Sequence, residues 1–196
     1  MRPAVQRRVF LSFLGAACVA AAMAAPDASA KKPPRKQVVK RPVYKGRAMV
    51  NFSSPEKPGT IIIRTDERAL YQVLGKGRAM RYLVAVGKEG FLWQGIARIG
   101  MKRENPKWTP PAEMIKRTPK YAKWAHGMPG GNPQNPLGAR ALYLFNRKGD
   151  TGFRIHGTIV PSSIGTAASS GCIRMLNREV IELYSQTPVG TKVIVI

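Results

Sequence analysis

The 196-residue sequence has few of the residues that build metal sites and disulfide frameworks: two cysteines, two histidines and ten acidic residues. Two cysteines exclude a disulfide-rich scaffold. If Cys18 is removed with an N-terminal signal segment, two histidines and one cysteine remain, which is fewer than the four ligands of a structural zinc site. There is also no glycine-rich phosphate loop followed by Lys-Ser or Lys-Thr. We therefore expect no metal and no cofactor, and the scattered acids are a poor source of the paired carboxyl groups of a glycosidase.

Basic residues are abundant, because 33 lysines and arginines give a formal net charge of +23. Such a charge calls for a polyanionic partner, and nucleic acid, an anionic membrane and an anionic cell wall all qualify. The hydrophobic fraction of 44% is ordinary for a folded protein, so the chain as a whole is not disordered. Its length predicts one domain with tails, large enough to bury a core without disulfides.

The first 30 residues have the three-part layout of a secretory signal peptide. Residues 1–8 are basic, residues 9–25 are almost wholly apolar, and small residues at 22–24 (AMA) and 28–30 (ASA) offer cleavage sites. We expect cleavage by residue 30 and export to the periplasm or cell envelope. The alternative is an uncleaved membrane anchor, for which an apolar run of about 17 residues is at the lower limit.

Cleavage would change the cysteine count and leave the charge almost untouched. Cys18 lies in the apolar run and would be removed, which leaves Cys172 as the one cysteine of the mature chain. A lipoprotein signal is disfavoured because Leu14 is one position too far from Cys18. Loss of residues 1–30 removes three arginines and Asp27, so 30 basic and 9 acidic residues remain, with a net charge of +21. Exported proteins seldom meet nucleic acid, and we expect envelope polymers or anionic lipid headgroups to be the partners of this charge.

Residues 31–57 form a basic, proline-rich segment that begins KKPPRKQVVKRPVYKGR. It cannot bury enough apolar surface to offset the entropy of ordering it, so we expect a disordered tether before a folded domain at 58–196. The tether would hold the domain near an anionic envelope surface by an attraction that is screened beyond about 8–10 Å. A solvated spacer without a partner is an equally good interpretation.

The folded part is predicted to be mainly β, with one or two short helices. Short apolar and alternating stretches between turn residues are typical of strands. Strands are expected at residues 60–65, 69–74, 81–86, 141–145, 153–156 and 192–196, with short strand pieces at 90–100. Thr109, followed by two prolines and an acid, predicts the start of a helix that ends before Pro119. Asn177 is expected to cap a second helix that runs to about Gln186.

Residues 120–137 are rich in glycine and proline, which predicts a long loop. The loop contains Trp124 and His126, and together with Trp93 and Trp108 it is a candidate lid over a site. Packing of these tryptophans in the core explains them equally well. For His126 we favour a contact within the loop over a role in the site.

Cys172 and His156 are the candidate catalytic pair. Cys172 follows Gly171, which permits a tight turn whose backbone N–H groups can point at one spot, as an oxyanion hole requires. Arg174 lies two residues further on, and a helix starting near Asn177 would lower the thiol pKa if its N-terminus faces the sulfur. His156 ends a predicted strand, which is a rigid platform for a base. Such a pair supplies a nucleophile and a proton shuttle for acyl transfer, and the alternative is a buried, inert cysteine.

Three short segments contain or lie between these two residues: 154–158 (RIHGT), 163–165 (SIG) and 169–175 (SSGCIRM). Together with residues 58–60, 108–111, 135–138 and 190–193, they resemble the L,D-transpeptidase (YkuD) catalytic domain family. The likeness covers residues 58–196. Ser170 departs from the commonest pattern, because many members have histidine there and serine is a frequent variant. The resemblance implies a YkuD-type β-sandwich.

The resemblance also implies roles for the site residues. Cys172 corresponds to the nucleophile and His156 to the general base and acid. Backbone N–H groups of Gly171 and Cys172 would hold the oxyanion. Ser170, or a backbone carbonyl near Gly157, would orient the His156 ring.

Peptidoglycan stem peptides are the substrates that the resemblance implies. The cysteine thiolate attacks the carbonyl of the diamino acid at the third position of a donor stem, and D-alanine leaves. An amine of a second stem then attacks the thioester and completes a crosslink. Arg174 would help to hold the site or a substrate carboxylate, and the basic mature chain suits these acidic peptides.

The same residues allow other activities. The acceptor amine would come from an outer-membrane protein if the enzyme anchors that protein to the wall, and water as acceptor would make an L,D-carboxypeptidase. A non-catalytic, basic wall-binding module predicts that Cys172→Ala leaves function intact. A cysteine endopeptidase is disfavoured because its cysteine usually precedes its histidine, although such residues occur in several orders.

Overall fold

The computed structural model describes residues 46–196. The predicted signal peptide at 1–30 and the greater part of the predicted tether at 31–57 lie outside these residues. Between residues 46 and 196, no helix is both long and apolar enough to cross a membrane.

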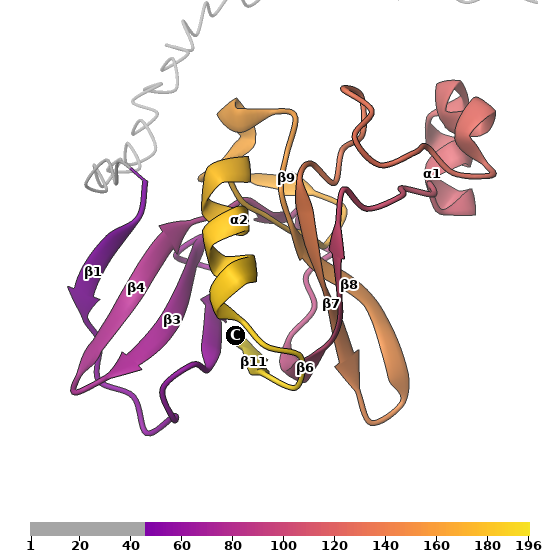
Figure 1. The fold of residues 1–196 in the computed structure, drawn as a ribbon. Coiled ribbons are helices and arrows are strands. Elements are labelled where there is room, and N and C mark those ends of the chain that lie inside the picture. The colour runs from indigo at the N-terminus through magenta and orange to yellow at the C-terminus, as the bar shows by residue number, and fades with distance from the viewer. Residues whose placement is uncertain (1–45) are drawn as a thin grey trace, which may run out of the picture. The chain divides into compact units, whose positions relative to one another are not determined.

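Nine strands of the described chain form one large sheet, which Figure 1 shows. Its strand order is β1-β4-β3-β2-β11-β6-β7-β8-β10, and β5 and β9 form a second sheet of two strands. Neighbours in the large sheet are antiparallel, except that β2–β11 and β8–β10 are parallel. The mainly β architecture predicted from the sequence is confirmed. The strands are β1 (Ala48–Asn51), β2 (Ile61–Arg64), β3 (Ala69–Gly75), β4 (Arg78–Leu83), β5 (Val86–Gly87), β6 (Gly95–Glu104), β7 (Arg140–Asn146), β8 (Gly149–His156), β9 (Ala167–Ser169), β10 (Ile173–Arg174) and β11 (Lys192–Val195).

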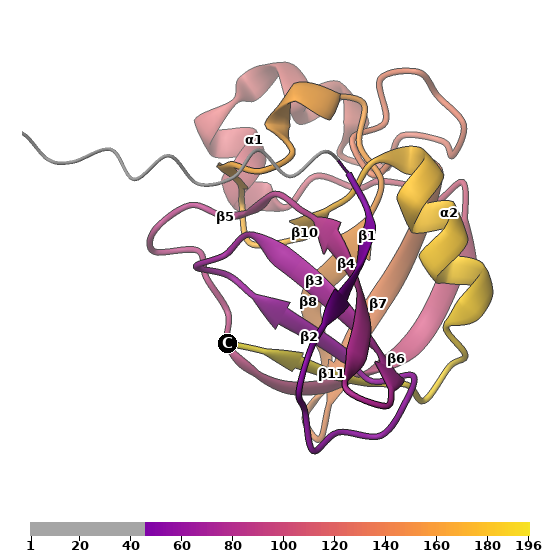
Figure 2. The ribbon, with the colours of Figure 1, turned by 90° about the vertical axis from the view of Figure 1, so that its left-hand side faces the viewer.

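Buried side chains from most strands of the large sheet form one hydrophobic core. The helix α2 (Asn177–Gln186) lies beside the sheet (Figures 1 and 2) and contributes Val180 and Leu183 to this core. The core takes fully buried side chains from β2, β7 and α2, among them Ile63, Leu142, Leu144 and Leu183. Burial of each such side chain contributes about 1.5–3 kcal/mol. Because side chains alternate between the faces of a strand, Tyr143 and Phe145 lie on the outer face of β7, away from this core.

β1 lies inside the segment that we expected to be disordered up to residue 57. Residues 48–51 pair with 78–81 of β4, and Val50 packs against a second buried cluster. The expectation of disorder is therefore wrong for these residues. Composition alone does not show that the edge of β4 offers backbone partners, which help to offset the entropy of ordering the segment.

Two strand predictions need new boundaries. The strand expected at 81–86 divides into β4 and β5, which belong to different sheets. The short pieces expected at 90–100 are instead one long strand, β6, because Gly100 does not interrupt it. A Cβ at Gly100 would lie 2.4 Å from the Phe145 ring, so this glycine permits the close packing of β6 under that ring.

Helices occupy little of the described chain. They are α1 (Ala112–Arg117), the 3-10 turns η1 (Pro119–Trp124) and η2 (Pro161–Ser163), and α2. α1 ends before Pro119, as predicted, but Thr109 does not cap it, because Pro111 directly precedes the helix and gives no side-chain cap. Asn177 is the first residue of α2 and does not cap it either.

Candidate active site

A cavity of about 680 Å³ lies where β8 and β10 meet α1 and η1. Both Cys172 and His156 line it. Its cationic lining residues are Lys107, Arg117, Arg154 and Arg174, and no carboxylate lines it. The remaining lining residues are Trp108, Thr109, Pro111, Met114, Thr118, Tyr121, Pro136, Leu137, Tyr143, Gly152, Ser169 and Ser170.

Parallel pairing of β8 and β10 places the two candidate catalytic residues in the lining of the same cavity. His156 is the last residue of β8 and pairs with Arg174, while Cys172 directly precedes β10. His156 is 4% exposed and Cys172 is half-buried. The sequence associated these residues by resemblance, and the strand register places Cys172 two positions before Arg174, the residue that pairs with His156.

The His156 ring has a defined hydrogen-bond partner, the carbonyl oxygen of Gly157, which lies 2.7 Å from Nδ1. A carbonyl only accepts, so Nδ1 carries the proton and the neutral ring keeps its lone pair on Nε2. Burial lowers the pKa of His156 to about 4, while backbone contacts to Gly157 and Leu137 oppose this shift. The imidazole is therefore neutral near pH 7 and free to accept a proton. Of the two orienting groups expected from the sequence, the structure shows the Gly157 carbonyl; Ser170 is an exposed residue of the cavity wall.

Asn177 holds the segment that carries this carbonyl. Its Oδ1 accepts hydrogen bonds of 3.1 Å from the N–H groups of Ala139 and Thr158, and its Nδ2 donates to the Thr158 carbonyl at 3.0 Å. A Cβ at Gly157 would lie 2.0 Å from Oδ1, so only glycine fits there. The sequence pattern identified Asn177 as a helix cap and missed this role, which depends on segments far apart in the chain.

Ser169 braces the turn before Cys172. Its hydroxyl donates to the Cys172 carbonyl at 2.6 Å and accepts from the Gly171 N–H at 3.1 Å. The Gly171 N–H, which we expected at an oxyanion, thus has a hydrogen-bond partner within the turn. Gly171 is needed for another reason: its φ is +113°, and a Cβ would lie 2.5 Å from the Phe153 ring.

Burial also decides the state of the Cys172 thiol. It raises the pKa of Cys172 above the ordinary value, and the backbone of Arg154 and the charges of Arg154 and Arg174 oppose it with smaller effects. The lowering expected from a helix N-terminus is not seen, since the net shift of the Cys172 pKa is upward. The resting pair is thus a neutral thiol and a neutral imidazole.

Arg154 forms the side of the cavity next to Cys172. It makes two hydrogen bonds of 2.7 Å to Asp150, and its guanidinium lies 4.2 Å from the centre of the Tyr143 ring. The ion pair and the cation–π contact fix the arginine against β7. Arg174, which has no such partner among the described residues, adds a second cation to this wall.

Only some residues of the predicted loop and of its candidate aromatic lid line the cavity. Trp108 is 8% exposed and meets the Tyr121 ring edge to face at 5.2 Å, so it is a fixed wall of the cavity. Asn135 ties the loop together through its side-chain bonds to Pro106, Pro129 and Leu137. Trp93, Trp124 and His126 are not among the residues that line the cavity. Within residues 46–196, no three His, Cys, Asp or Glu side chains gather as metal ligands would.

Comparison with known proteins gives a consistent family. The model of the L,D-transpeptidase catalytic domain (YkuD) matches residues 58–195. The putative L,D-transpeptidase YqjB of Bacillus subtilis is 40% identical over 117 residues, which are 58% of this chain and 57% of that protein. The chain spans about half the length of the curated relatives it matches.

Solved structures with the same fold were also found. A Brucella melitensis protein named a probable carnitine operon oxidoreductase is 47% identical, with a TM-score of 0.54, and the match covers 80% of this chain and 96% of that one. An L,D-transpeptidase from Mycobacterium smegmatis is 16% identical, with a TM-score of 0.52, and the match covers 70% of this chain and 58% of that one. The second similarity shows the fold alone. Because the family model spans nearly the whole described domain, with Cys172 and His156 inside it, this chain belongs to the L,D-transpeptidase (YkuD) catalytic domain family.

Proposed function

We propose that the protein is a peptidoglycan L,D-transpeptidase in which Cys172 is the nucleophile and His156 the proton shuttle. The observation that carries this proposal is the arrangement of the two residues. They line the same cavity at the ends of paired strands, and the bond from His156 to the Gly157 carbonyl leaves the Nε2 lone pair available.

The first half-reaction acylates the enzyme. Sγ of Cys172 attacks the carbonyl carbon of the diamino acid in the donor stem while Nε2 of His156 accepts the thiol proton. The backbone N–H of Cys172 is the donor of this turn that we assign to the oxyanion, since Ser169 engages that of Gly171. When the C–N bond breaks, His156 protonates the departing amine of D-alanine, and a thioester remains.

The second half-reaction transfers the acyl group. The amine of an acceptor stem attacks the thioester carbonyl, His156 takes a proton from that amine, and the C–S bond breaks. The proton returns to the sulfur and restores the neutral pair. A neutral pair costs less to hold in a buried site than a thiolate–imidazolium pair, because charges created before substrate arrives would be poorly solvated there.

The charge of the cavity supports acidic stem peptides as substrates. Four cations and no carboxylate line it. Arg154 is paired with Asp150, but among the described residues no carboxylate pairs with Lys107, Arg117 or Arg174. Arg174 also pairs with His156 in the strand register. We assign Arg174 to a carboxylate of the donor stem, because a guanidinium binds carboxylates with two parallel hydrogen bonds.

Acylation by a carbapenem tests the nucleophile directly. Intact-mass spectra of the full chain should show one adduct, and peptide mapping should place it on Cys172. His156→Asn should slow acylation by about two to four orders of magnitude, and Cys172→Ala should abolish it. A folded, reduced wild-type protein that forms no adduct would refute the enzymatic proposal and favour a basic wall-binding module.

Muropeptide profiles of a deletion strain test the acceptor. Loss of diamino-acid crosslinks is the expected result. Loss of wall-bound protein would instead assign an outer-membrane protein as the acceptor, and an accumulation of tetrapeptide stems with crosslinks intact would assign an L,D-carboxypeptidase.

We further propose that the domain acts in the periplasm after removal of residues 1–30, which have the pattern of a signal peptide. N-terminal sequencing of the protein from a periplasmic fraction should give a start at or before Lys31. A chain that retains residues 1–30 and stays with the membrane would contradict this proposal.

A further inference from the structure

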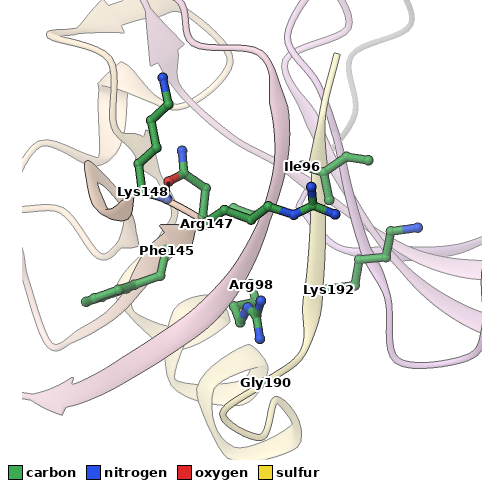
Figure 3. Close-up of a pocket in the computed structure, with 9 residues that line it drawn as sticks. Ile96, Arg98, Phe145, Arg147, Lys148, Gly190 and Lys192 are labelled. Atoms are coloured by element: carbon green, nitrogen blue, oxygen red, sulfur yellow. Dashed lines mark hydrogen bonds between the residues drawn. The ribbon is translucent and has the colours of Figure 1, made fainter.

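A second cavity, of about 570 Å³, lies between β6, β11 and the turn that joins β7 to β8 (Figure 3). Its lining combines cations with an apolar floor and includes no carboxylate. Figure 3 shows the Arg147 side chain reaching across the cavity toward β11. The cations are Arg98, Arg147, Lys148 and Lys192, and the apolar residues are Ile96, Ala97 and Phe145.

Most of the positive charge in this cavity is not neutralised. Lys192 binds Glu56 at 2.8 and 2.9 Å, but among the described residues no carboxylate pairs with Arg98, Arg147 or Lys148. Ile96 stands beside these cations with 63% of its surface exposed. A ligand that carries both carboxylates and small apolar groups would satisfy the two features together.

The two cavities open along the same face of the sheet. Tyr143 lines the catalytic cavity and Phe145 lines the second one, and both lie on the outer face of β7, about 7 Å apart along the strand. On β7, Ala141 faces His156 and Asn146 faces Gly149, so five residue steps place the turn about 17 Å from the catalytic end of β8. The acid between the cavities, Asp150, is neutralised by its pairing with Arg154. An anionic polymer can therefore cover both cavities without meeting an unpaired carboxylate of β8.

We propose that the second cavity binds another acidic stem peptide of the same peptidoglycan polymer whose donor stem occupies the catalytic cavity. This inference rests on the proposed function. The guanidinium and ammonium groups would bind the stem carboxylates, and the apolar floor would contact the alanine methyl groups. Because both stems belong to one polymer, binding of the second raises the effective concentration of the first at Cys172.

Steady-state kinetics with two substrates test this site. The variant is the full chain with Arg98→Gln, Arg147→Gln and Lys148→Gln. The substrates are polymeric peptidoglycan strands and a muropeptide with a single stem. For the polymer we expect KM to rise about tenfold with kcat unchanged, because the lost contact is made by a second stem. For the single-stem muropeptide, both constants should stay the same.

A charge-matched control distinguishes binding in the second cavity from general electrostatic attraction between the basic protein and the acidic polymer. Lys57→Gln, Lys76→Gln and Lys88→Gln remove equal charge from exposed positions that line neither cavity. This control should leave KM for the polymer within about twofold of the wild type. Equal losses in both triple variants, or no change in the first, would overturn the proposal. Arg147→Glu alone is a second variant, and it should raise KM for the polymer at an unchanged melting temperature.

Two further measurements assign the cause of a negative result. Carbapenem acylation of Cys172 should be identical in the wild type and both triple variants, and its absence in the wild type would refute the catalytic proposal instead of this one. Sedimentation with phosphatidylglycerol vesicles tests a lipid surface as the occupant. If the first triple variant loses vesicle binding but keeps the wild-type KM for the polymer, the stem-peptide assignment is overturned.

Discussion

Replacement of Asn177 should destabilise the domain and change the pKa of the His156 ring, and two variants separate these effects. The Asn177 side chain makes three hydrogen bonds to backbone groups of Ala139 and Thr158. Asn177→Ala loses all three, and at about 1 kcal/mol each the loss is about 3 kcal/mol. For a domain of this size, such a loss lowers the melting temperature by roughly 6–12 °C.

Asn177→Asp gives a different result. A carboxylate still accepts from the two N–H groups, but it cannot donate to the Thr158 carbonyl, so the expected cost is about 1–2 kcal/mol. The added negative charge near the Gly157 segment favours imidazolium and raises the pKa of His156. The acid limb of the pH profile for carbapenem acylation should therefore move to higher pH, whereas Asn177→Ala should lower the rate without that shift.

Urea denaturation and the pH dependence of acylation together check this reasoning. Gln186, at the exposed C-terminal end of α2, provides the control, and Gln186→Ala should change neither quantity. If Asn177→Ala lowers the free energy of unfolding by less than about 0.5 kcal/mol, the hydrogen bonds of Asn177 do not hold the segment around Gly157 and Thr158 in place. If Asn177→Asp leaves the acid limb in place, Asn177 is a structural residue only.

Three other outcomes follow from burial and packing. Because burial holds the pKa of His156 near 4, while an unfolded imidazole titrates near 6.5, the unfolded state takes up the proton first as pH falls. The free energy of unfolding should drop between about pH 6.5 and pH 4, by up to roughly 3 kcal/mol, and calorimetry of His156→Asn should show no such loss. Gly171→Ala should cost at least about 2 kcal/mol in urea denaturation, because of its positive φ and the Phe153 ring, and a stable variant would show that the turn can move. The iodoacetamide reaction of Cys172 should keep accelerating above pH 9, because burial raises the pKa of the thiol, and a plateau below pH 8 would contradict the neutral-pair mechanism.

The helix that begins at Asn177 was predicted from local sequence pattern, but the contacts of the Asn177 side chain were not. The spacing of Val180 and Tyr184 predicted a helix, and the structure has it with the predicted end at Gln186. The role of Asn177 depends on Ala139 and Thr158, which only the folded chain brings to it. β1 was missed for the same reason, because this strand forms by pairing with β4.

The sequence by itself determined the mainly β class, most strand positions, and the pairing of Cys172 with His156 in one family-specific motif, because alternation, turn residues and motif spacing are local properties. The tertiary structure alone decided that the Gly157 carbonyl orients the imidazole, that Ser169 engages the Gly171 N–H, and that the thiol rests protonated. It also placed the second cationic cavity on the face that carries the first. Hydrogen-bond partners, desolvation and the shape of a cavity depend on residues distant in the chain, and no local pattern encodes their distance or burial.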